Sequence, residues 1–451
     1  MGYAGDTIVA ISTPQGLGAI GMIRLSGGEA IAIADRVFSK RLVDAPGYSL
    51  HFGQFLVGDK ALDEVLVSVF RAPRSFTKED VVEISFHGSP YILREALHAL
   101  LASGARLAEA GEFTQRAYLN GAMDLAQAEA VADLIASNSA QAHGLALAQM
   151  RGGISRELKD LRGRLLDFTS LLELELDFAE EDVEFADRGQ FDALLGEMLD
   201  RIGGLMRSFS YGNAIKEGVP TAIIGKPNAG KSTLLNQLLQ DNRAIVSAQA
   251  GTTRDVIEER LVIDGIEFRL QDTAGIRETQ DEIEAEGVQR SLGLAQRASV
   301  VVYLYDPIQE SPQEAEAAIQ SMDLPAATRI LIVANKADLS TEQATGHISI
   351  SAKTGLNVAT LKEAMVAAVQ SYRDASPNTE SVVITNARHL TALQQTHEAL
   401  ETARQGLKAG ISGDLVAIDI RAALYALGSI TGEISTEEVL GNIFGKFCIG
   451  K

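Results

Sequence analysis

The sequence has little cysteine, no tryptophan and a deficit of positive charge. Its 451 residues include one cysteine, and 60 acidic side chains outnumber 40 basic ones, which leaves a formal net charge of −20. A single cysteine excludes an intrachain disulfide and fits a reducing compartment. The negative charge opposes nonspecific binding of nucleic acid, so any contact with RNA requires a local basic patch or a basic partner.

Long apolar runs are also missing: none reaches the length of a membrane span, and residues 1–6 lack the basic and apolar regions of a signal peptide. We therefore expect a cytoplasmic protein that does not associate with membranes. The length of the chain favours about three domains. Its 46% hydrophobic and 22% charged residues are typical of well-cored globular proteins.

One glycine-containing stretch, residues 225–232, matches the pattern G-x-x-x-x-G-K-[ST]. An expected strand at residues 219–224 precedes it, and an expected helix at residues 233–239 follows it. Such a turn directs backbone N–H groups and the positive end of a helix dipole to one point, where a phosphate chain is the natural ligand. Lys231 is placed to reach the β- and γ-phosphates, and the Ser232 hydroxyl to bind Mg²⁺.

Three further motifs, each after a predicted strand, identify the base. Residues 272–275 read D-x-x-G, where an aspartate meets the Mg²⁺ shell and a glycine N–H meets the γ-phosphate. Residues 335–338 read N-K-A-D, and the Asp338 carboxylate accepts from guanine N1–H and the 2-amino group, two donors that adenine lacks. Residues 351–353 bring backbone toward guanine O6. The set predicts a GTPase domain, with the three strands at residues 266–271, 329–334 and 347–350.

The residues expected to act in hydrolysis depart from the Ras scheme. Thr253 is predicted to bind Mg²⁺ and the γ-phosphate in the GTP state and to release them after hydrolysis. The position after D-x-x-G, where Ras-like GTPases use a glutamine to orient water, holds Ile276. The acidic run at residues 278–286 offers candidates for this role, although such a run is also typical of a solvated helix face.

The predicted fold class is multidomain. We expect an α+β domain at residues 1–120 and an α/β P-loop GTPase (Ras-like) domain at residues 216–375. The GTPase domain is inserted into an all-α helical domain formed by residues 121–215 and 376–451, because neither helical part buries its leucine stripe well alone. A helical region is expected at residues 124–149, a polar linker at residues 210–218 and a helix cap at Asp414.

Two charges lie within predicted strands of the N-terminal domain. Arg24 follows an apolar triplet, and Glu83 lies between two apolar residues. A charge on a strand usually marks its solvent-facing side. The alternative is a ligand pocket, in which the arginine holds a carboxylate and the glutamate a ring N–H. For Cys448, the one cysteine, in a short C-terminal tail, two interpretations remain: its thiol has a function, or its side chain is buried as a small apolar group.

The whole chain resembles the tRNA-modification GTPase family called MnmE or TrmE. Besides the phosphate loop and residues 251–255, the resemblance rests on D-T-I-V-A at residues 6–10, G-E-F-T at 111–114, D-L-A-Q-A-E at 124–129 and C-I-G-K at 448–451. It implies a homodimer, and a tetrahydrofolate derivative (5-formyl- or 5,10-methylene-tetrahydrofolate) bound by Arg24, Glu83 and Lys451 with Cys448 nearby. Where the family usually has lysine, this chain has Ala122, so a cationic folate contact is lost or supplied elsewhere.

The resemblance also implies how hydrolysis proceeds without the glutamine. Two GTPase domains pair, and a K⁺ ion lies near the phosphates, bound by Asn228, Ser247, Gln249 and Thr252. Glu284 matches the carboxylate that positions water. With the flavoprotein partner MnmG (GidA), in a heterotetramer or larger complex, family members add an aminomethyl-type group to C5 of the wobble uridine of certain tRNAs.

Lys231, Thr253 and Glu284 are accordingly assigned to catalysis, and Ser232 and Thr253 to Mg²⁺. A second hypothesis is a GTP-controlled assembly factor for ribosomes or RNA, with an N-terminal domain that only dimerises. A P-loop ATPase is disfavoured by Asp338. The residues assigned to the nucleotide are Asn228, Ala229, Gly230, Lys231, Ser232, Thr233, Ser247, Ala248, Gln249, Ala250, Gly251, Thr252, Thr253, Asp272, Thr273, Ala274, Gly275, Asn335, Lys336, Ala337, Asp338, Ser351, Ala352 and Lys353.

Overall fold

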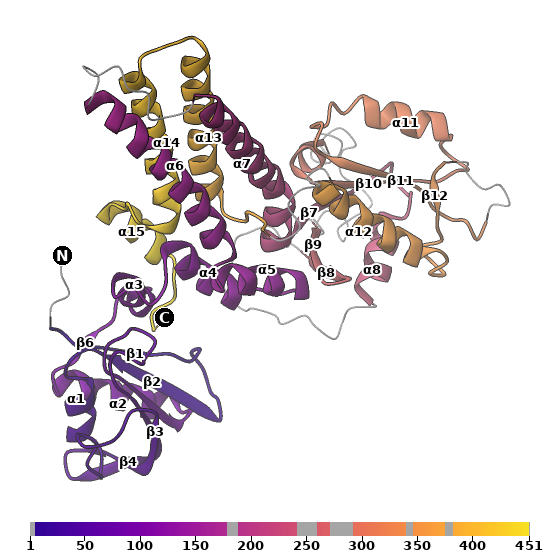
Figure 1. The fold of residues 1–451 in the computed structure, drawn as a ribbon. Helices are drawn as coiled ribbons and strands as arrows, with labels where there is room; N and C mark the ends of the chain where they lie inside the picture. The colour runs from indigo at the N-terminus through magenta and orange to yellow at the C-terminus, as the bar shows by residue number, and fades with distance from the viewer. Residues whose placement is uncertain are drawn as a thin grey trace. The chain divides into compact units, whose positions relative to one another are not determined.

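The computed structural model describes residues 5–177, 188–240, 259–270, 292–339, 346–374 and 382–450. The chain forms two compact units, one made of Met1–Ala132 with Gly428–Lys451 and the other of Asp133–Leu427 (Figure 1). The predicted multidomain architecture is confirmed: a mixed sheet with helices, a helical bundle and a mostly parallel α/β sheet follow one another along the chain. In the described segments, no helix combines the length and the apolar character needed to cross a bilayer.

The first unit is built on a six-stranded sheet in the order β3-β4-β5-β2-β1-β6. Alternate strand residues pack with α1 (Ala30–Arg36) and α2 (Pro90–Ala102) into one apolar core. Period-two alternation of this kind is what lets a sheet bury one face and leave the other to solvent. The strands are β1 Ile8–Ile11, β2 Ile20–Ser26, β3 Ser49–Val57, β4 Lys60–Phe70, β5 Val81–His87 and β6 Arg106–Leu107.

The end of the chain returns to this first unit. The helix α15 (Glu437–Phe444) packs its Leu440 and Phe444 against α4 (Leu125–Ala136). The Tyr118 hydroxyl, on α3 (Glu112–Leu119), donates to the Gly432 carbonyl at 2.7 Å. Segments from opposite ends of the sequence therefore share one core.

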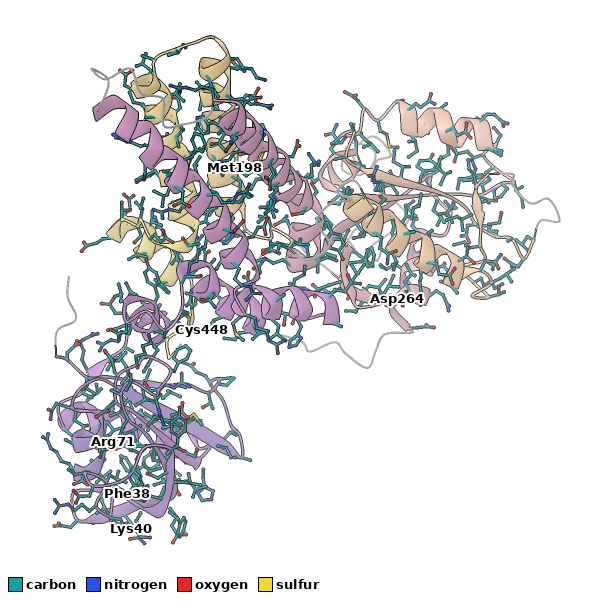
Figure 2. The ribbon with its side chains drawn as sticks, viewed as in Figure 1. Phe38, Lys40, Arg71, Met198, Asp264 and Cys448 are labelled. Atoms are coloured by element: carbon teal, nitrogen blue, oxygen red, sulfur yellow. The ribbon has the colours of Figure 1, made fainter. Side chains whose placement is uncertain are left out.

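The second unit contains the helical bundle, formed by α6 (Gly153–Asp177), α7 (Arg188–Glu217), α13 (Ala387–Lys408) and α14 (Gly413–Thr431). Several leucines of the predicted stripes are buried: Leu158, Leu161, Leu165, Leu195, Leu199, Leu205, Leu393 and Leu400. Phe168 of α6 stacks on Phe191 of α7 at 4.2 Å between ring centroids. Figure 2 shows Met198 of α7 inside this bundle. The GTPase sheet is inserted in sequence between α7 and α13.

The helical region expected at residues 124–149 is confirmed and consists of two helices, α4 and α5 (Ala140–Met150), since Ser139 caps α5 by accepting from the Ala142 N–H. Two other local expectations were wrong. Residues 210–217 continue α7 instead of forming a linker, since Ala214 and Ile215 are buried on its inner face. Asp414 lies inside α14, and the Ser412 carbonyl accepts the first helical N–H groups.

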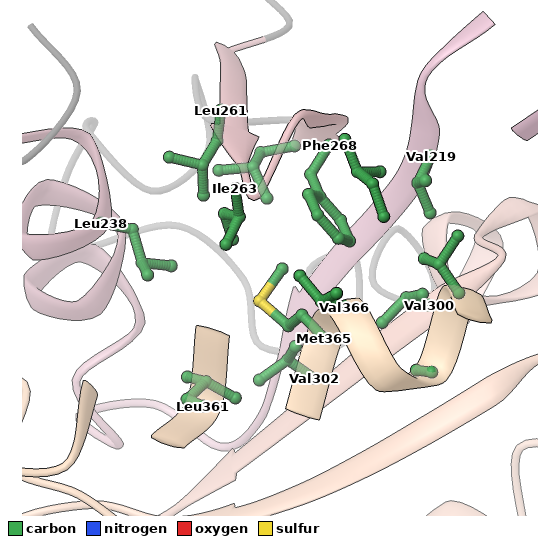
Figure 3. Packing of buried hydrophobic residues seen from close by; sticks show 14 of the residues in the cluster. Val219, Leu238, Leu261, Ile263, Phe268, Val300, Val302, Leu361, Met365 and Val366 are labelled. Atoms are coloured by element: carbon green, nitrogen blue, oxygen red, sulfur yellow. The ribbon is translucent and has the colours of Figure 1, made fainter. Parts of the chain in front are cut away.

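The second sheet has the order β12-β11-β10-β7-β9-β8, with β8 and β9 antiparallel and the other pairs parallel. Central strand β10 (Val300–Tyr305) is buried at every position, as expected for a strand covered on both faces. Its even-numbered residues face the core formed with α8 (Lys231–Gln240) and α12 (Val358–Asp374), shown in Figure 3, and its odd-numbered residues face α11 (Pro312–Gln320). The other strands are β7 Val219–Ile224, β8 Glu259–Ile263, β9 Ile266–Leu270, β11 Arg329–Ala334 and β12 Ile348–Ser349.

Candidate nucleotide-binding site

The phosphate loop connects β7 to α8 at the carboxyl edge of the parallel strands. Asn228 (φ 62°) and Gly230 (φ 98°) turn the chain so that α8 begins at Lys231. The Lys231 ammonium donates to the carbonyls of Gly225 and Lys226, at 2.9 Å each. Within the described part of the chain its partners are thus carbonyls rather than carboxylates, and burial lowers the pKa of Lys231. The cation is therefore held in place with its charge available to a phosphate.

One buried side chain, Asn335, ties the phosphate loop to both predicted guanine loops. Its Nδ2 donates to the Ala229 carbonyl at 2.7 Å, and its Oδ1 accepts from the Ala352 N–H at 2.9 Å. A Cβ at Gly230 would collide with the Asn335 amide, so only glycine permits this approach. Three segments far apart in the sequence are thereby brought together as a GTPase requires.

The predicted guanine loop at residues 335–338 presents an exposed carboxylate. Asp338 is exposed, and a hydrogen bond from the Ser351 side chain lowers the pKa of its carboxyl group. Lys336, the second residue of the N-K-A-D motif, donates to Asp306 at 2.6 Å. The ionised Asp338 side chain fits the role of acceptor for guanine N1–H and the 2-amino group.

Several predicted site residues lie outside the described residues. These are Ser247, Ala248, Gln249, Ala250, Gly251, Thr252, Thr253, Asp272, Thr273, Ala274, Gly275, Glu284 and Lys451. The described members of the nucleotide set occupy the phosphate loop and the starts of the two guanine loops, and their contacts build one site.

Sequence reasoning missed the short loop after β10, residues 306–310. Asp306 reaches Lys336, and Glu310 reaches Lys226 of the phosphate loop at 3.2 Å. Two carboxylates placed just after a buried parallel strand were the available signal, because the carboxyl ends of such strands line the ligand crevice.

Arg24 and Glu83 form a half-buried ion pair across β2 and β5. The two residues are register partners, and Nε and NH2 of Arg24 lie 2.8 and 2.7 Å from Oε1 of Glu83. The Arg24 guanidinium also lies 5.7 Å from the ring centre of Phe113 and 5.8 Å from that of Phe76. The Arg24 guanidinium is therefore close to two aromatic rings, and both members of the ion pair are partly shielded from solvent.

The C-terminal tail lies beside the end of β1 and the start of α3. Ser12 Oγ donates to the Gly450 carbonyl at 3.2 Å, and the Gly111 N–H to the Cys448 carbonyl at 3.4 Å. Gly450 has φ 94° and packs against the Ile11 carbonyl. The thiol of Cys448, labelled in Figure 2, is exposed, so the buried alternative was wrong.

The helix α3 carries a buried hydroxyl that lacks a hydrogen-bond partner among the described residues. The hydroxyl of Thr114, which follows Phe113 on α3, is buried and has no hydrogen-bond partner in the described chain. Buried hydroxyls are normally satisfied, and an orphan one needs an explanation such as a bound molecule.

An ion network in the first unit was not foreseen. Arg116, 2% exposed, lies 2.9 Å from the fully buried Glu112 and 2.6 Å from Asp6. Arg106 contacts the same two carboxylates at 2.6 and 2.7 Å. Burial alone would raise the pKa values of Asp6 and Glu112, but the hydrogen bonds from the two arginines outweigh it and lower both.

Comparison with known proteins assigns the chain to a protein family. The model for the MnmE helical domain matches residues 125–448, and the model described as GTP-binding protein TrmE N-terminus matches residues 7–122. The chain belongs to the MnmE family. The tRNA modification GTPase MnmE of Cytophaga hutchinsonii is 51% identical over 99% of this chain and 98% of its own length. The MnmE protein of Christiangramia forsetii is 49% identical over 99% of each chain.

Membership of the MnmE family agrees with the geometry of the site, and the protein is a GTP hydrolase. The crystal structure of Era in complex with MgGDPNP and nucleotides 1506–1542 of 16S ribosomal RNA is 26% identical to it. That match covers 40% of this chain and 65% of the Era chain, with a TM-score of 0.26.

Proposed function

We propose that the protein is a K⁺-stimulated GTPase whose cycle drives a folate-dependent modification of tRNA. Together with a flavoprotein partner, MnmG (GidA), it adds an aminomethyl or carboxymethylaminomethyl group to C5 of the wobble uridine, U34, of certain tRNAs. Two features of one chain of the MnmE family carry the proposal. Asn335 joins the two predicted guanine loops to the phosphate loop, and the same sheet holds the Arg24–Glu83 pair and the strand β1, whose end contacts the tail.

In the GTPase site, Ser232 and Thr253 would hold Mg²⁺, and Asn228, Ser247, Gln249 and Thr252 would hold K⁺. A monovalent cation there offsets the charge that develops between the β- and γ-phosphates. Asn228 lies within the phosphate loop, at a left-handed backbone position with φ 62°, and this location supports the role. Glu284 would position the attacking water.

Hydrolysis assays test the cation directly. Turnover is expected to be faster in K⁺ than in Na⁺ at equal ionic strength, and Asn228→Ala is expected to remove the difference. Equal rates in the two salts would contradict the K⁺ site, while leaving the GTPase assignment in place.

In the first unit, Arg24, Glu83 and Lys451 would bind a 5-formyl- or 5,10-methylene-tetrahydrofolate, which supplies the one-carbon unit. A cation is available near the position of the missing family lysine, since Lys78 Nζ donates to the Gly121 carbonyl at 2.6 Å, next to Ala122. Titration with 5-formyltetrahydrofolate tests the site, and Arg24→Met is expected to weaken binding. No binding to the unaltered protein at high micromolar concentration would remove the folate step.

A homodimer is supported by one uncovered face of the first sheet. Phe52 of β3 and Leu66 of β4 are register partners on this face and are 56% and 42% exposed, with Leu50 beside them at 63%. Adjacent exposed apolar side chains on an edge strand are a typical site of association. Light scattering is expected to show a dimer for the unaltered protein and monomers for Phe52→Glu.

Coupling of hydrolysis to the modification would begin at the turn between β8 and β9. The Gln141 N–H of α5 donates to the Gly265 carbonyl at 3.2 Å, and its side chain to the Asp264 carbonyl at 3.1 Å. Asp264 is labelled at this turn in Figure 2. In the sequence, this hairpin lies between two motifs that we expect to contact the γ-phosphate. Residues 251–255, with Thr253, precede it, and the D-x-x-G motif at residues 272–275 follows it.

The decisive test is nucleoside analysis of wobble uridines in cells that lack the protein. The modified nucleoside is expected to disappear, and to return with the unaltered gene but not with Lys231→Ala. An unchanged wobble position, combined with GTP-dependent co-sedimentation with ribosomal subunits, would favour an assembly factor instead.

A further inference from the structure

The loop after β10 carries two buried carboxylates that the proposed chemistry does not use. Asp306 and Glu310 are 4% and 2% exposed. Asp306 holds Lys336 of the guanine loop, and Glu310 holds Lys226 of the phosphate loop. This short segment therefore touches both loops on which the nucleotide site is built.

The surroundings of Glu310 make its pairing with Lys226 important. Its Oε1 accepts from the Tyr303 hydroxyl at 2.9 Å and lies 3.2 Å from Lys226 Nζ, while its Oε2 is buried without a hydrogen-bond partner in the described chain. Burial and Glu310 raise the pKa of Tyr303, so the phenol stays protonated and can donate. A carboxylate this buried is costly unless a cation compensates it, and Lys226 supplies that charge.

We infer that Glu310 is a positioning residue for the phosphate loop. By fixing the Lys226 side chain, it orients the backbone of residues 225 and 226, whose carbonyls hold the Lys231 ammonium. Glu310 acts through Lys226 and needs no contact of its own with the nucleotide. The inference rests on residues 225–232 being the GTP site of the proposed function.

The effect should appear in nucleotide binding as well as in fold stability. The Lys226 side chain is 51% exposed, so water screens part of the pair and reduces its contribution to folding. The Lys226 carbonyl, however, also accepts the Ala229 N–H at 3.3 Å, so this residue shapes the turn that presents N–H groups to the phosphates. Releasing it adds freedom to a loop that must be ordered in the complex, which favours dissociation.

Release of a fluorescent GDP analogue from the full-length protein, followed by stopped flow at fixed Mg²⁺, provides the test. Glu310→Gln and Lys226→Met are each expected to speed release by about fivefold to tenfold. The double variant is expected to be no faster than either single one, because both changes break one contact.

Two variants separate positioning from simple loss of charge or stability. Glu314→Gln removes a charge from the start of the neighbouring helix and keeps the capping box with Ser311, since glutamine serves at that position as well. Tyr303→Phe removes the phenol hydrogen bond and leaves the Lys226 pair. Both should release the analogue at close to the unaltered rate, even where the melting temperature falls.

The outcomes are distinct. Unchanged release in Glu310→Gln, or effects of the two single variants that multiply in the double one, would overturn the inference. Should Glu310→Gln fail to fold, Lys226→Met decides alone, and an unaltered release rate counts against the role. Failure of the unaltered protein to bind the analogue would instead refute the nucleotide site itself.

Discussion

The Lys231 ammonium of the phosphate loop meets the backbone, whereas in the N-terminal ion network charged side chains meet one another. Lys231 is held by two carbonyls, and Asn335 bridges a carbonyl and an N–H group. In the first unit, Arg116 instead lies between Glu112 and Asp6, at 2.9 and 2.6 Å. The first arrangement leaves charge available to a ligand, and the second uses its charge internally.

The difference separates function from stability. A substitution at a charge held by carbonyls should remove binding energy and leave the fold intact. A substitution in the internally paired network should leave a buried charge without its partner, which is among the costliest changes in a folded protein. The two regions therefore predict opposite outcomes for variants of similar chemistry.

The largest expected effect is in the network, for Arg116→Met. Removing the guanidinium takes one of its two cationic partners from the fully buried Glu112 and leaves only Arg106, so the first unit should lose up to about 3–5 kcal/mol of stability. Hydrogen exchange of peptides from β1, β2 and α3 measures the loss within this unit. Arg94→Met, an exposed arginine of α2, is the matched control and should lose little. Full protection of these peptides in Arg116→Met would mean that the network does not stabilise the unit.

In the nucleotide site, Asp338→Asn should have the opposite character. Two charge-assisted hydrogen bonds to guanine are lost or reversed, so GTP affinity should fall roughly 100-fold, about 3 kcal/mol, with the melting temperature unchanged. Xanthosine triphosphate should gain affinity, because its C2 carbonyl accepts from the new amide. Asp323→Asn, at an exposed turn with φ 46°, controls for the charge change, since asparagine tolerates that backbone. Unaltered preference for GTP would count against the base assignment.

The same contrast explains what the sequence could predict. The nucleotide site is written in short contiguous motifs, and residues 335–338 lie at the end of a strand whose predicted bounds, 329–334, agree with the structure. Asp6 and Arg116 are 110 positions apart, and nothing local marks them as partners. Likewise residues 210–217 look polar in isolation, but tertiary burial of Ile215 extends the helix through them.

The stability of the N-terminal ion network should depend on pH. The pKa values of Asp6 and Glu112 are lower in the folded protein than the ordinary values near about 3.9 and 4.3. Their stabilising contribution is therefore present above those ordinary values and is lost as the pH falls through the lower folded values. At pH values below about 4, the first unit should unfold at a lower urea concentration than at neutral pH. This dependence of stability on pH should weaken in Arg116→Met, because the two carboxyl groups lose one of their cations. An equal pH dependence in the variant would place the acid sensitivity elsewhere.

The smallest expected effect concerns the hydrogen bond between the Gln141 side chain of α5 and the backbone of the β8–β9 turn. As in the nucleotide site, a side chain here meets the backbone. Gln141→Ala removes the hydrogen bond to the Asp264 carbonyl and leaves the Gln141 N–H bonded to Gly265, so stability should change by only about 1 kcal/mol. If the turn transmits the nucleotide state, the difference in hydrogen exchange of α5 between GTP-analogue and GDP complexes should shrink in this variant. Gln405→Ala, on the exposed face of α13, should leave that difference unchanged. A full difference in Gln141→Ala would show that this side chain is not needed for the signal, because the backbone contact alone would suffice to carry it.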